Sequence, residues 1–166
     1  MGTCMMTSRE QEIVELIELL FFAYRDFVSD PDEILRDYGF GRAHHRIVHF
    51  VGRNPGIRVA ELLDILRITK QSLGRVLKDL IESGHVEQRE GNSDRRHRLL
   101  FLTEKGEGLR RKLVRPQIER FSAALTASGP GSTGAYRDVL LHLVNPEDRE
   151  EVEARISRNP AMPVLD

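Results

Sequence analysis

The amino-acid sequence predicts a mainly α-helical fold of the α+β class, and three observations support this prediction. Apolar residues recur at helical spacing in several long segments. Two short stretches, 86–89 and 98–102, are predicted to be strands, and the turn-forming residues 91–94 between them predict a hairpin. The chain has 166 residues, which suits one domain or one domain with helical extensions.

Composition limits the class of protein. Hydrophobic residues make up 40% of the chain, enough for a core, and charged residues make up 31%, which is typical of long solvated helical faces. The formal net charge is -1, so a DNA-binding interpretation must rest on local charge. The segment 9–37 is strongly acidic, whereas Arg95, Arg96 and Arg98 cluster in the hairpin.

The sequence also indicates where the protein works. It has no apolar run that approaches the roughly 20 residues of a membrane span, and residues 1–10 lack the features of a signal peptide. Cys4 is the single cysteine, so no intrachain disulfide can form. We therefore expect a cytoplasmic protein with no membrane partner.

The N-terminal segment 9–37 is predicted to be helical, with one strongly apolar side that requires a large partner surface. Asp30 followed by Pro31 has the pattern of a capping residue with proline at the first helical position, so we expect a new helix to start there. The apolar residues at helical spacing are Ile13, Leu16, Ile17, Leu20, Phe21, Tyr24, Phe27 and Val28.

Three helices are predicted in the middle of the chain. The first covers residues 41–52, and a short second helix covers 59–66. After the tight connection 67–68, Thr69 can cap the third helix, because its hydroxyl can accept an amide of the first turn. That helix ends near Gly84, which tolerates the left-handed conformation.

The C-terminal part is predicted to be helical again. Thr103 opens a long helix, and Pro116 lies inside it, so we expect a kink or a break at that proline. A loop at 128–131 precedes a helix at about 136–144, and a last acidic helix ends near residue 157.

The order of these elements, namely a helix, a short helix, a tight turn, a helix and a hairpin, is that of a winged helix-turn-helix. In the helix that begins at Thr69, apolar residues share one face, while Gln71, Arg75 and Lys78 lie opposite at i, i+4 and i+7. Glutamine can read adenine, and arginine can read guanine or contact phosphate. The positive helix end near Thr69 and Lys70 suits a phosphate.

An exposed polar face alone is most simply a solvated surface. The adjoining hairpin favours DNA binding, because Asp94, Arg95 and Arg96 at its tip serve no core. Arginine favours a narrow minor groove, where the electrostatic potential is most negative. Asp94 can hold one guanidinium in a fixed pose through a bidentate pair.

Five stretches together resemble the MarR family of transcriptional regulators. ITKQSLGRVLKDL at 68–80 resembles the family's recognition helix, and SGHVEQR at 83–89 resembles its entry into the wing. DRR at 94–96 matches the D-x-R wing element, and LTEKG at 102–106 matches the L-T-x-K-G that closes the wing. YGFGRAHHR at 38–46 resembles the stretch leading into the second helix.

The resemblance is clear over about residues 38–109, and the first and last helices match in pattern only. It implies a homodimer whose terminal helices interlock, with recognition helices in major grooves and wing arginines in minor grooves. Arg58 departs from the family, which often has a capping Ser or Thr there, so the short helix is expected to start less firmly or Arg58 to meet phosphate. We expect an N-terminal dimerisation helix 9–37, a DNA-binding lobe 38–103, C-terminal dimerisation helices 104–158, and flexible tails 1–8 and 159–166.

The resemblance therefore implies two partners, double-stranded DNA and a second copy of the chain, and no cofactor. We expect a repressor or dual regulator of a pseudo-palindromic operator. A small effector usually binds between the dimer helices and the DNA-binding lobes of such proteins and shifts their spacing. The candidate DNA-contacting residues are Thr69, Lys70, Gln71, Ser72, Arg75 and Lys78 of the recognition helix, and Asp94, Arg95 and Arg96 of the wing.

His44, His45 and His49 are candidates for an effector crevice or a metal site. His45 and His49 are four residues apart on a helix, but two imidazoles make only half a zinc site and no close acid on that turn completes it. We therefore expect no metal, and plain core packing remains the alternative to a crevice. Cys4 precedes the first helix, which favours a plain tail cysteine over a redox sensor.

The sequence carries no enzyme signature. It has no glycine-rich phosphate loop, no nucleophile elbow and no H-E-x-x-H, so we expect no catalysis. The alternative to a regulator is a winged-helix protein-interaction module that does not bind DNA. The near-zero net charge and the acidic ends favour that alternative, whereas Gln71, Arg75, Arg95 and Arg96 oppose it.

Overall fold

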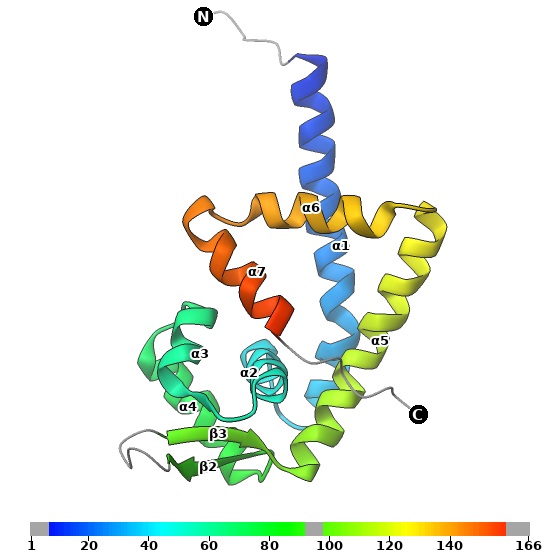
Figure 1. Ribbon diagram of the computed structural model, residues 1–166. Coiled ribbons are helices and arrows are strands. Elements are labelled where there is room, and N and C mark those ends of the chain that lie inside the picture. Colours follow the sequence, from blue (N-terminus) through cyan, green and yellow to red (C-terminus); the bar gives the residue numbers. More distant parts are fainter. Residues whose placement is uncertain (1–6, 92–97, 159–166) are drawn as a thin grey trace, which may run out of the picture.

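The computed structural model of the protein describes residues 7–91 and 98–158. Two long helices, α1 and α5, form an arm, and a smaller lobe of helices and strands lies beside it (Figure 1). The elements are α1 (Ser8–Arg36), α2 (Arg42–Arg53), β1 (Ile57–Arg58), α3 (Val59–Leu66), α4 (Lys70–Glu82), β2 (Val86–Glu90), β3 (Arg98–Leu102), α5 (Glu104–Ser128), α6 (Ser132–Leu143), the 3-10 helix η1 (Pro146–Asp148) and α7 (Arg149–Arg158).

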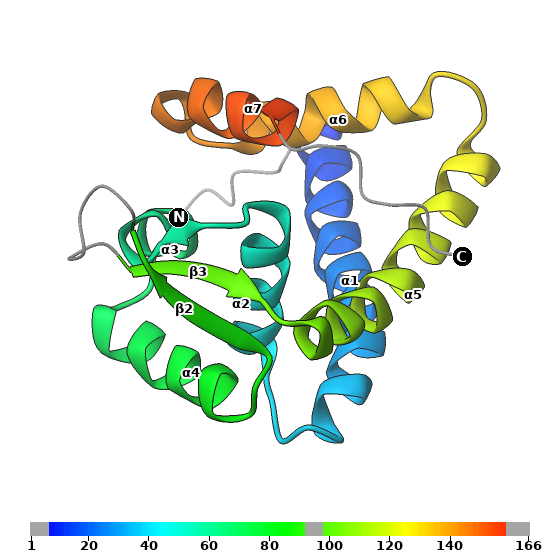
Figure 2. The same cartoon turned by 60° about the horizontal axis from the view of Figure 1, so that its bottom comes forward.

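The lobe combines α2, α3 and α4 with an antiparallel sheet of strand order β1-β3-β2. Strand β2 pairs with β3 so that Val86 lies opposite Leu102 and Glu90 opposite Arg98. Figure 2 shows these two strands crossing in front of α2, with α4 along their other side. The arrangement of helices and hairpin is the winged helix-turn-helix that the order of elements predicts.

One hydrophobic cluster holds the lobe to the beginning of α5. Each helix of the lobe contributes the apolar face that its periodicity predicts. Burying a large aliphatic side chain stabilises a fold by about 1.5–3 kcal/mol, so this cluster is the main source of the lobe's stability. Its most deeply buried members, each at most 1% exposed, are Leu35, Ile47, Val48, Val51, Leu62, Leu73, Leu80, Leu100 and Leu113.

The two helices of the arm, α1 and α5, pack against each other. The rings of Phe27 and Phe121 meet edge to face with centroids 5.4 Å apart, and Arg120 Nη2 lies 2.9 Å from Asp30 Oδ2. From the end of α5, helix α6 passes across the middle part of α1 in this view, and α7 returns toward the lobe (Figure 1). In the part of the chain that the structure describes, no helix is both long and apolar enough to span a membrane.

Two prolines do not interrupt their helices as we expected. Helix α1 continues through Pro31, where we predicted a new helix, and α5 continues through Pro116 without the break that was one expected outcome. A proline inside a helix costs about 3 kcal/mol, since it removes a backbone hydrogen bond and crowds the preceding turn. Packing outweighs that cost, because Pro31 is itself buried and Leu35, one turn later, is 1% exposed.

Strand β1 has no counterpart in the sequence prediction. It consists of Ile57 and Arg58 alone, which is too short for any alternation to be recognised. Its partner is the free edge of β3, where Ile57 lies opposite Leu100. The Gly56 amide extends the pairing by donating to the Leu100 carbonyl at 2.8 Å.

Candidate nucleic-acid interface

Thr69 caps α4 as its position in the sequence predicts. Its backbone is extended, and its hydroxyl oxygen accepts a hydrogen bond from the Ser72 amide at 3.1 Å. The same hydroxyl donates to Ser72 Oγ at 2.9 Å. The cap leaves Lys70 and Gln71 exposed in the first helical turn, at the positive end of the helix dipole.

The two faces of α4 separate as predicted. Leu73, Leu77 and Leu80 are buried in the lobe, whereas Arg75 and Lys78 are exposed on the opposite side together with Gln71. Lys78 Nζ lies 3.6 Å from Glu82 Oε1, an exposed pair that contributes little to stability. The helix therefore presents one amide and two cationic groups to solvent within about two turns.

The turn between α3 and α4 contains an unusual backbone conformation. Arg67 ends α3 in the left-handed region, with φ 49°, and is the single non-glycine residue with positive φ among residues 7–91 and 98–158. Its Nη2 lies 2.6 Å from Oδ1 of Asp148 in η1. The ion pair thus connects the turn before α4 to the C-terminal helices.

Helix α3 begins without a side-chain cap, as the arginine at position 58 predicts. The Glu61 carboxylate, however, accepts from the Arg58 amide at 3.0 Å and from Arg58 Nε at 3.1 Å. Half of a capping box is therefore present, and the Arg58 guanidinium is already engaged with Glu61.

A glycine turn and a cross-strand contact shape the base of the hairpin. Gly84 has φ 74° after the end of α4, which allows the chain to turn directly into β2. On β2, the Arg89 guanidinium lies 4.4 Å from the centre of the Phe101 ring of β3 and also pairs with Glu87. Asp94, Arg95 and Arg96, the predicted wing residues, lie outside the described residues.

The segment LTEKG fastens the hairpin to α4 and α5, through contacts that go beyond the closing of the wing expected from the sequence. Thr103 Oγ1 donates to the Gly84 carbonyl at 2.6 Å and accepts from the Gly106 amide at 3.1 Å. Lys105 Nζ donates to the Ser83 carbonyl at 2.7 Å. A Cβ on Gly106 would lie 1.9 Å from the carbonyl oxygen of His85, so only glycine fits there.

The three candidate histidines of α2 have different surroundings. His44 Nε2 lies 3.2 Å from Asp79 Oδ2 of α4. His45 is half-buried, and burial lowers its pKa, which Asp32 partly opposes. Burial also lowers the pKa of His49, to about 4. Among residues 7–91 and 98–158, no three His, Cys, Asp or Glu side chains gather in a way that could hold a metal ion.

His49 faces a cavity of about 530 Å³ between the lobe and α7. Phe50 and Ile65 of the lobe form an apolar part of its wall. Arg67 and Asp148, which form an ion pair, also line the cavity. The further apolar lining comes from the C-terminal segment, at Val144, Val152 and Ile156.

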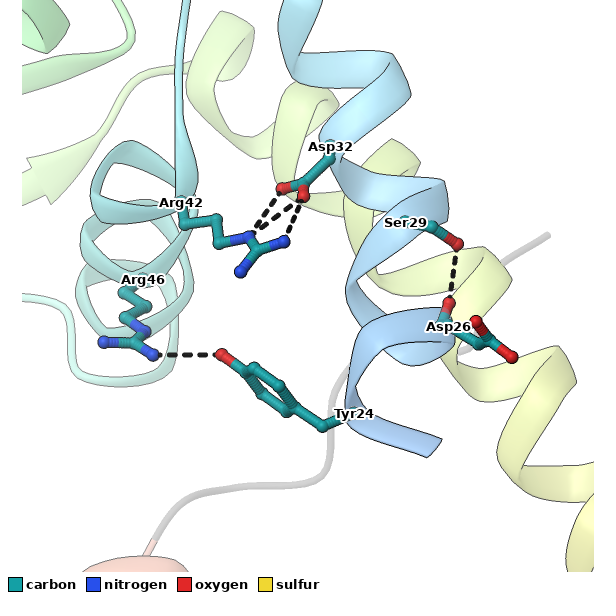
Figure 3. A network of polar contacts seen from close by, with 6 residues as sticks. All are labelled: Tyr24, Asp26, Ser29, Asp32, Arg42 and Arg46. Carbon is teal, nitrogen blue, oxygen red and sulfur yellow. Dashed lines mark hydrogen bonds and ion pairs between the residues drawn. The ribbon is translucent and has the colours of Figure 1, made fainter. Parts of the chain in front are cut away.

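Polar contacts connect α1 to α2, and so the arm to the lobe (Figure 3). Arg42 donates to both oxygens of Asp32, with Nε and Nη2 at 2.9 and 2.8 Å from Oδ2. One turn along α2, Arg46 Nη2 donates to the Tyr24 hydroxyl at 3.2 Å. These contacts hold the first two turns of α2 against α1.

Comparisons with known proteins agree with this geometry. Residues 38–97 match the sequence model of the MarR family. Over 152 residues, 92% of each chain, the protein is 44% identical to the HTH-type transcriptional regulator PetP of Rhodobacter capsulatus. Its fold is similar to Streptococcus pneumoniae FabT in complex with DNA, with a TM-score of 0.68 and 19% identity over 81% of this chain and 94% of that one. A MarR family regulator from Listeria monocytogenes complexed with 26mer DNA gives a TM-score of 0.67 and 20% identity, over 89% and 97% of the two chains.

Proposed function

Because the chain belongs to the MarR family of transcriptional regulators, we propose that it acts as a homodimeric repressor that reads a pseudo-palindromic operator with α4. It is a regulator and not an enzyme. The observation that carries the proposal is the face of α4, where Gln71, Arg75 and Lys78 are exposed opposite a buried apolar face. A dimer bound at an operator represses by excluding other proteins from that DNA.

We assign sequence reading to α4 in the major groove. Gln71 and Arg75 are one turn apart and exposed, and these side chains can make bidentate contacts to adenine and guanine. Lys70 and Lys78 neutralise phosphates on either side. Thr69 and Ser72 lie at the N-terminus of α4, where free backbone amides favour a phosphate oxygen.

We assign minor-groove and phosphate contacts to Asp94, Arg95 and Arg96 at the tip of the hairpin. The antiparallel register ends with Glu90 opposite Arg98, and the three residues belong to the sequence between these two strands. Arginine at such a tip suits a narrow minor groove. Asp94 is then the partner that orients one guanidinium.

Dimerisation through 9–37 and 104–158 is supported by apolar side chains that the single chain leaves exposed. Leu16, Leu19 and Phe21 of α1 are 61–67% exposed. Leu143, at the end of α6, is 65% exposed. An apolar surface of this kind, running along a helix 29 residues long, is typical of a protein interface.

We place the effector in the cavity between α2, α3 and α7. Its volume of about 530 Å³ is that of a small-molecule site, and its walls are mainly apolar. Of the three candidate histidines, His49 lines it. An occupant would contact Arg67 in the turn that precedes α4, and could therefore shift the recognition helix.

Selection of DNA from a random pool tests the proposal. The purified protein should enrich a pseudo-palindrome whose half-sites are about 10 base pairs apart, because a two-fold dimer presents its recognition helices one helical turn of DNA apart. Enrichment of a single, non-repeated site would contradict the dimeric mode of reading. Absence of any enriched sequence would favour the protein-interaction module instead.

A further inference from the structure

The His44 imidazole joins three parts of the DNA-binding lobe. It belongs to the first turn of α2, and the amide of Gly41, the residue before that helix, donates to His44 Nδ1 at 3.1 Å. A backbone amide can only donate, so Nδ1 carries no proton. The neutral ring therefore has its proton on Nε2, which donates to Asp79 Oδ2 of α4 at 3.2 Å.

Aromatic packing fixes the plane of this ring. Phe40 stacks on His44 with ring centroids 4.5 Å apart and an angle of 8° between the planes. Phe40 also meets the buried ring of His85 edge to face at 5.3 Å, and Tyr38 meets it at 5.6 Å. Since Lys112 of α5 donates to the Tyr38 hydroxyl at 3.2 Å, the cluster extends from α5 to the recognition helix.

Asp79 lies beside the face of α4 that we assign to DNA. It follows Arg75 by four residues, which places it about 40° around the helix axis. A carboxylate so close to that face repels phosphate and by itself weakens DNA binding. Its presence there therefore calls for another role. Its oxygen Oδ2 is instead engaged by His44, whose ring is itself held by the Gly41 amide and by Phe40.

We propose that His44 is a positioning residue for DNA reading, which fixes the rotation of α4 through Asp79. A rotation of about 20° about the helix axis moves a side-chain atom about 2 Å, at the radius of roughly 6 Å that side chains reach. Base hydrogen bonds tolerate a spread of about 0.5 Å in length. Release of Asp79 therefore impairs base reading more than it impairs contact with phosphate. This inference rests on the proposed reading of DNA by α4.

Two pairs of variants separate this role from charge and from folding. Asp79→Asn removes the charge but keeps an oxygen that can accept from His44 Nε2, whereas Asp79→Ala removes both. His44→Gln keeps a donor that can reach Asp79, whereas His44→Asn keeps an acceptor for the Gly41 amide and is too short to reach Asp79. Gln88→Ala is the control, because Gln88 is exposed on β2 and is not among the residues that we assign to DNA or to the dimer interface.

The measured quantity is the ratio of affinities for the selected operator and for random DNA at one salt concentration. Asp79→Ala and His44→Asn should each lower that ratio about tenfold, and the double variant should lower it no further, as coupled residues do. Asp79→Asn, His44→Gln and the control should stay within about twofold of the wild type. Thermal unfolding of each variant identifies any that lose stability, and those are compared at a lower temperature.

Two outcomes would overturn the inference. One is that Asp79→Asn and Asp79→Ala lower the ratio equally, because the effect would then come from the charge of Asp79 alone and not from its hydrogen bond to His44. The other is that His44→Asn discriminates as well as wild type. If the wild type itself shows no preference for any DNA sequence, the proposed function fails instead, and the two failures are thereby distinguished.

Discussion

Gly106 owes its identity to one backbone contact. It lies in the first turn of α5, where a Cβ would come within 1.9 Å of the His85 carbonyl oxygen and 3.3 Å of Leu102. The first atom is backbone and is already held, because the Thr103 amide donates to it at 3.1 Å. The close approach lets the first turn of α5 pack directly against His85, the residue before β2.

Gly106→Ala is expected to destabilise the protein by at least about 1–3 kcal/mol, the usual effect of forcing a methyl group into a packed site. Urea unfolding measures this. Gly108→Ala is the matched control in the same helix, where a Cβ meets nothing within 4 Å. The control should be neutral or stabilising by up to about 1 kcal/mol, since alanine favours a helix over glycine. Equal effects of the two changes would show that the His85 contact is relieved at no cost.

His49 makes stability depend on pH in one direction. Its pKa is lowered to about 4, mainly by burial and in smaller part by the neighbouring positive charges of His45, Arg53 and Arg110. The unfolded chain has the ordinary pKa of about 6.5 and therefore binds more protons than the folded chain between these values. The contribution of His49 to the free energy of unfolding is therefore fully present above a pH of about 6.5, and it is lost as the pH falls toward about 4.

We therefore expect urea midpoints to fall as the pH is lowered through that range, and to fall less steeply for His49→Gln. Burial also lowers the pKa values of His45 and His85, so part of the slope should persist in this variant. A His49→Gln profile parallel to that of wild type would contradict the assignment.

At the scale of elements, α4 and the hairpin are expected to contribute to DNA binding in different ways. Arg75→Ala and Gln71→Ala should change which operator variants bind, by about 1–3 kcal/mol for each bidentate base contact that is removed. Titration of a set of operators with single base changes decides this. If Arg75 contacts only phosphate, its removal will weaken binding to all operators alike.

The hairpin should act through phosphate. Arg96→Ala should weaken binding to all sequences and reduce the salt slope of log affinity by about 0.9 for each phosphate that the variant no longer neutralises. Asp94→Ala should reproduce part of this weakening, although it removes a negative charge, because the orienting partner of an arginine is gone. Titrations at several salt concentrations distinguish the two explanations. Tighter binding by Asp94→Ala would show that Asp94 orients no arginine.

For the whole molecule, the arm is the part that a single chain leaves incomplete. Leu16 and Leu20 lie one turn apart on α1 and are 63% and 47% exposed. Leu16→Glu combined with Leu20→Glu should convert a dimer into a monomer of 19.0 kDa, because it places charge in an apolar interface. Sedimentation equilibrium measures the mass, and operator affinity should fall with it.

Glu15→Gln is the control, since Glu15 is exposed on the same helix. Circular dichroism should show that the double variant keeps its helices, because these residues contribute little to the core of the single chain. A double variant that remains dimeric would exclude this part of α1 from the interface.

Much of the lobe was predictable because its signals are local. The period of 3.6 residues placed Leu73, Leu77 and Leu80 on the buried face of α4 and Arg75 on the opposite one. Thr69 and Thr103 cap their helices through a side chain and an amide three residues later, so their role needs no tertiary contact.

Where local and long-range terms compete, local rules failed. A new helix was expected at Pro31, yet α1 continues through it because packing outweighs one missing hydrogen bond, and α5 likewise continues through Pro116 without a break. Strand β1 forms only because β3 offers a free edge. The local sequence around β1 does not reveal the free edge of β3, and the local sequence around the prolines does not reveal the packing of their helices.

The contacts that orient the reading face belong wholly to the tertiary structure. His44 and Asp79 are 35 residues apart in the chain and meet at 3.2 Å, and Arg67 meets Asp148 across 81 residues at 2.6 Å. No periodicity relates such pairs. The sequence could therefore show which side chains α4 presents to solvent, since that depends on the geometry of one helix. How α4 is held against α2, and how the turn before it is tied to η1, depends on contacts between distant segments, and only the folded chain brings those segments together.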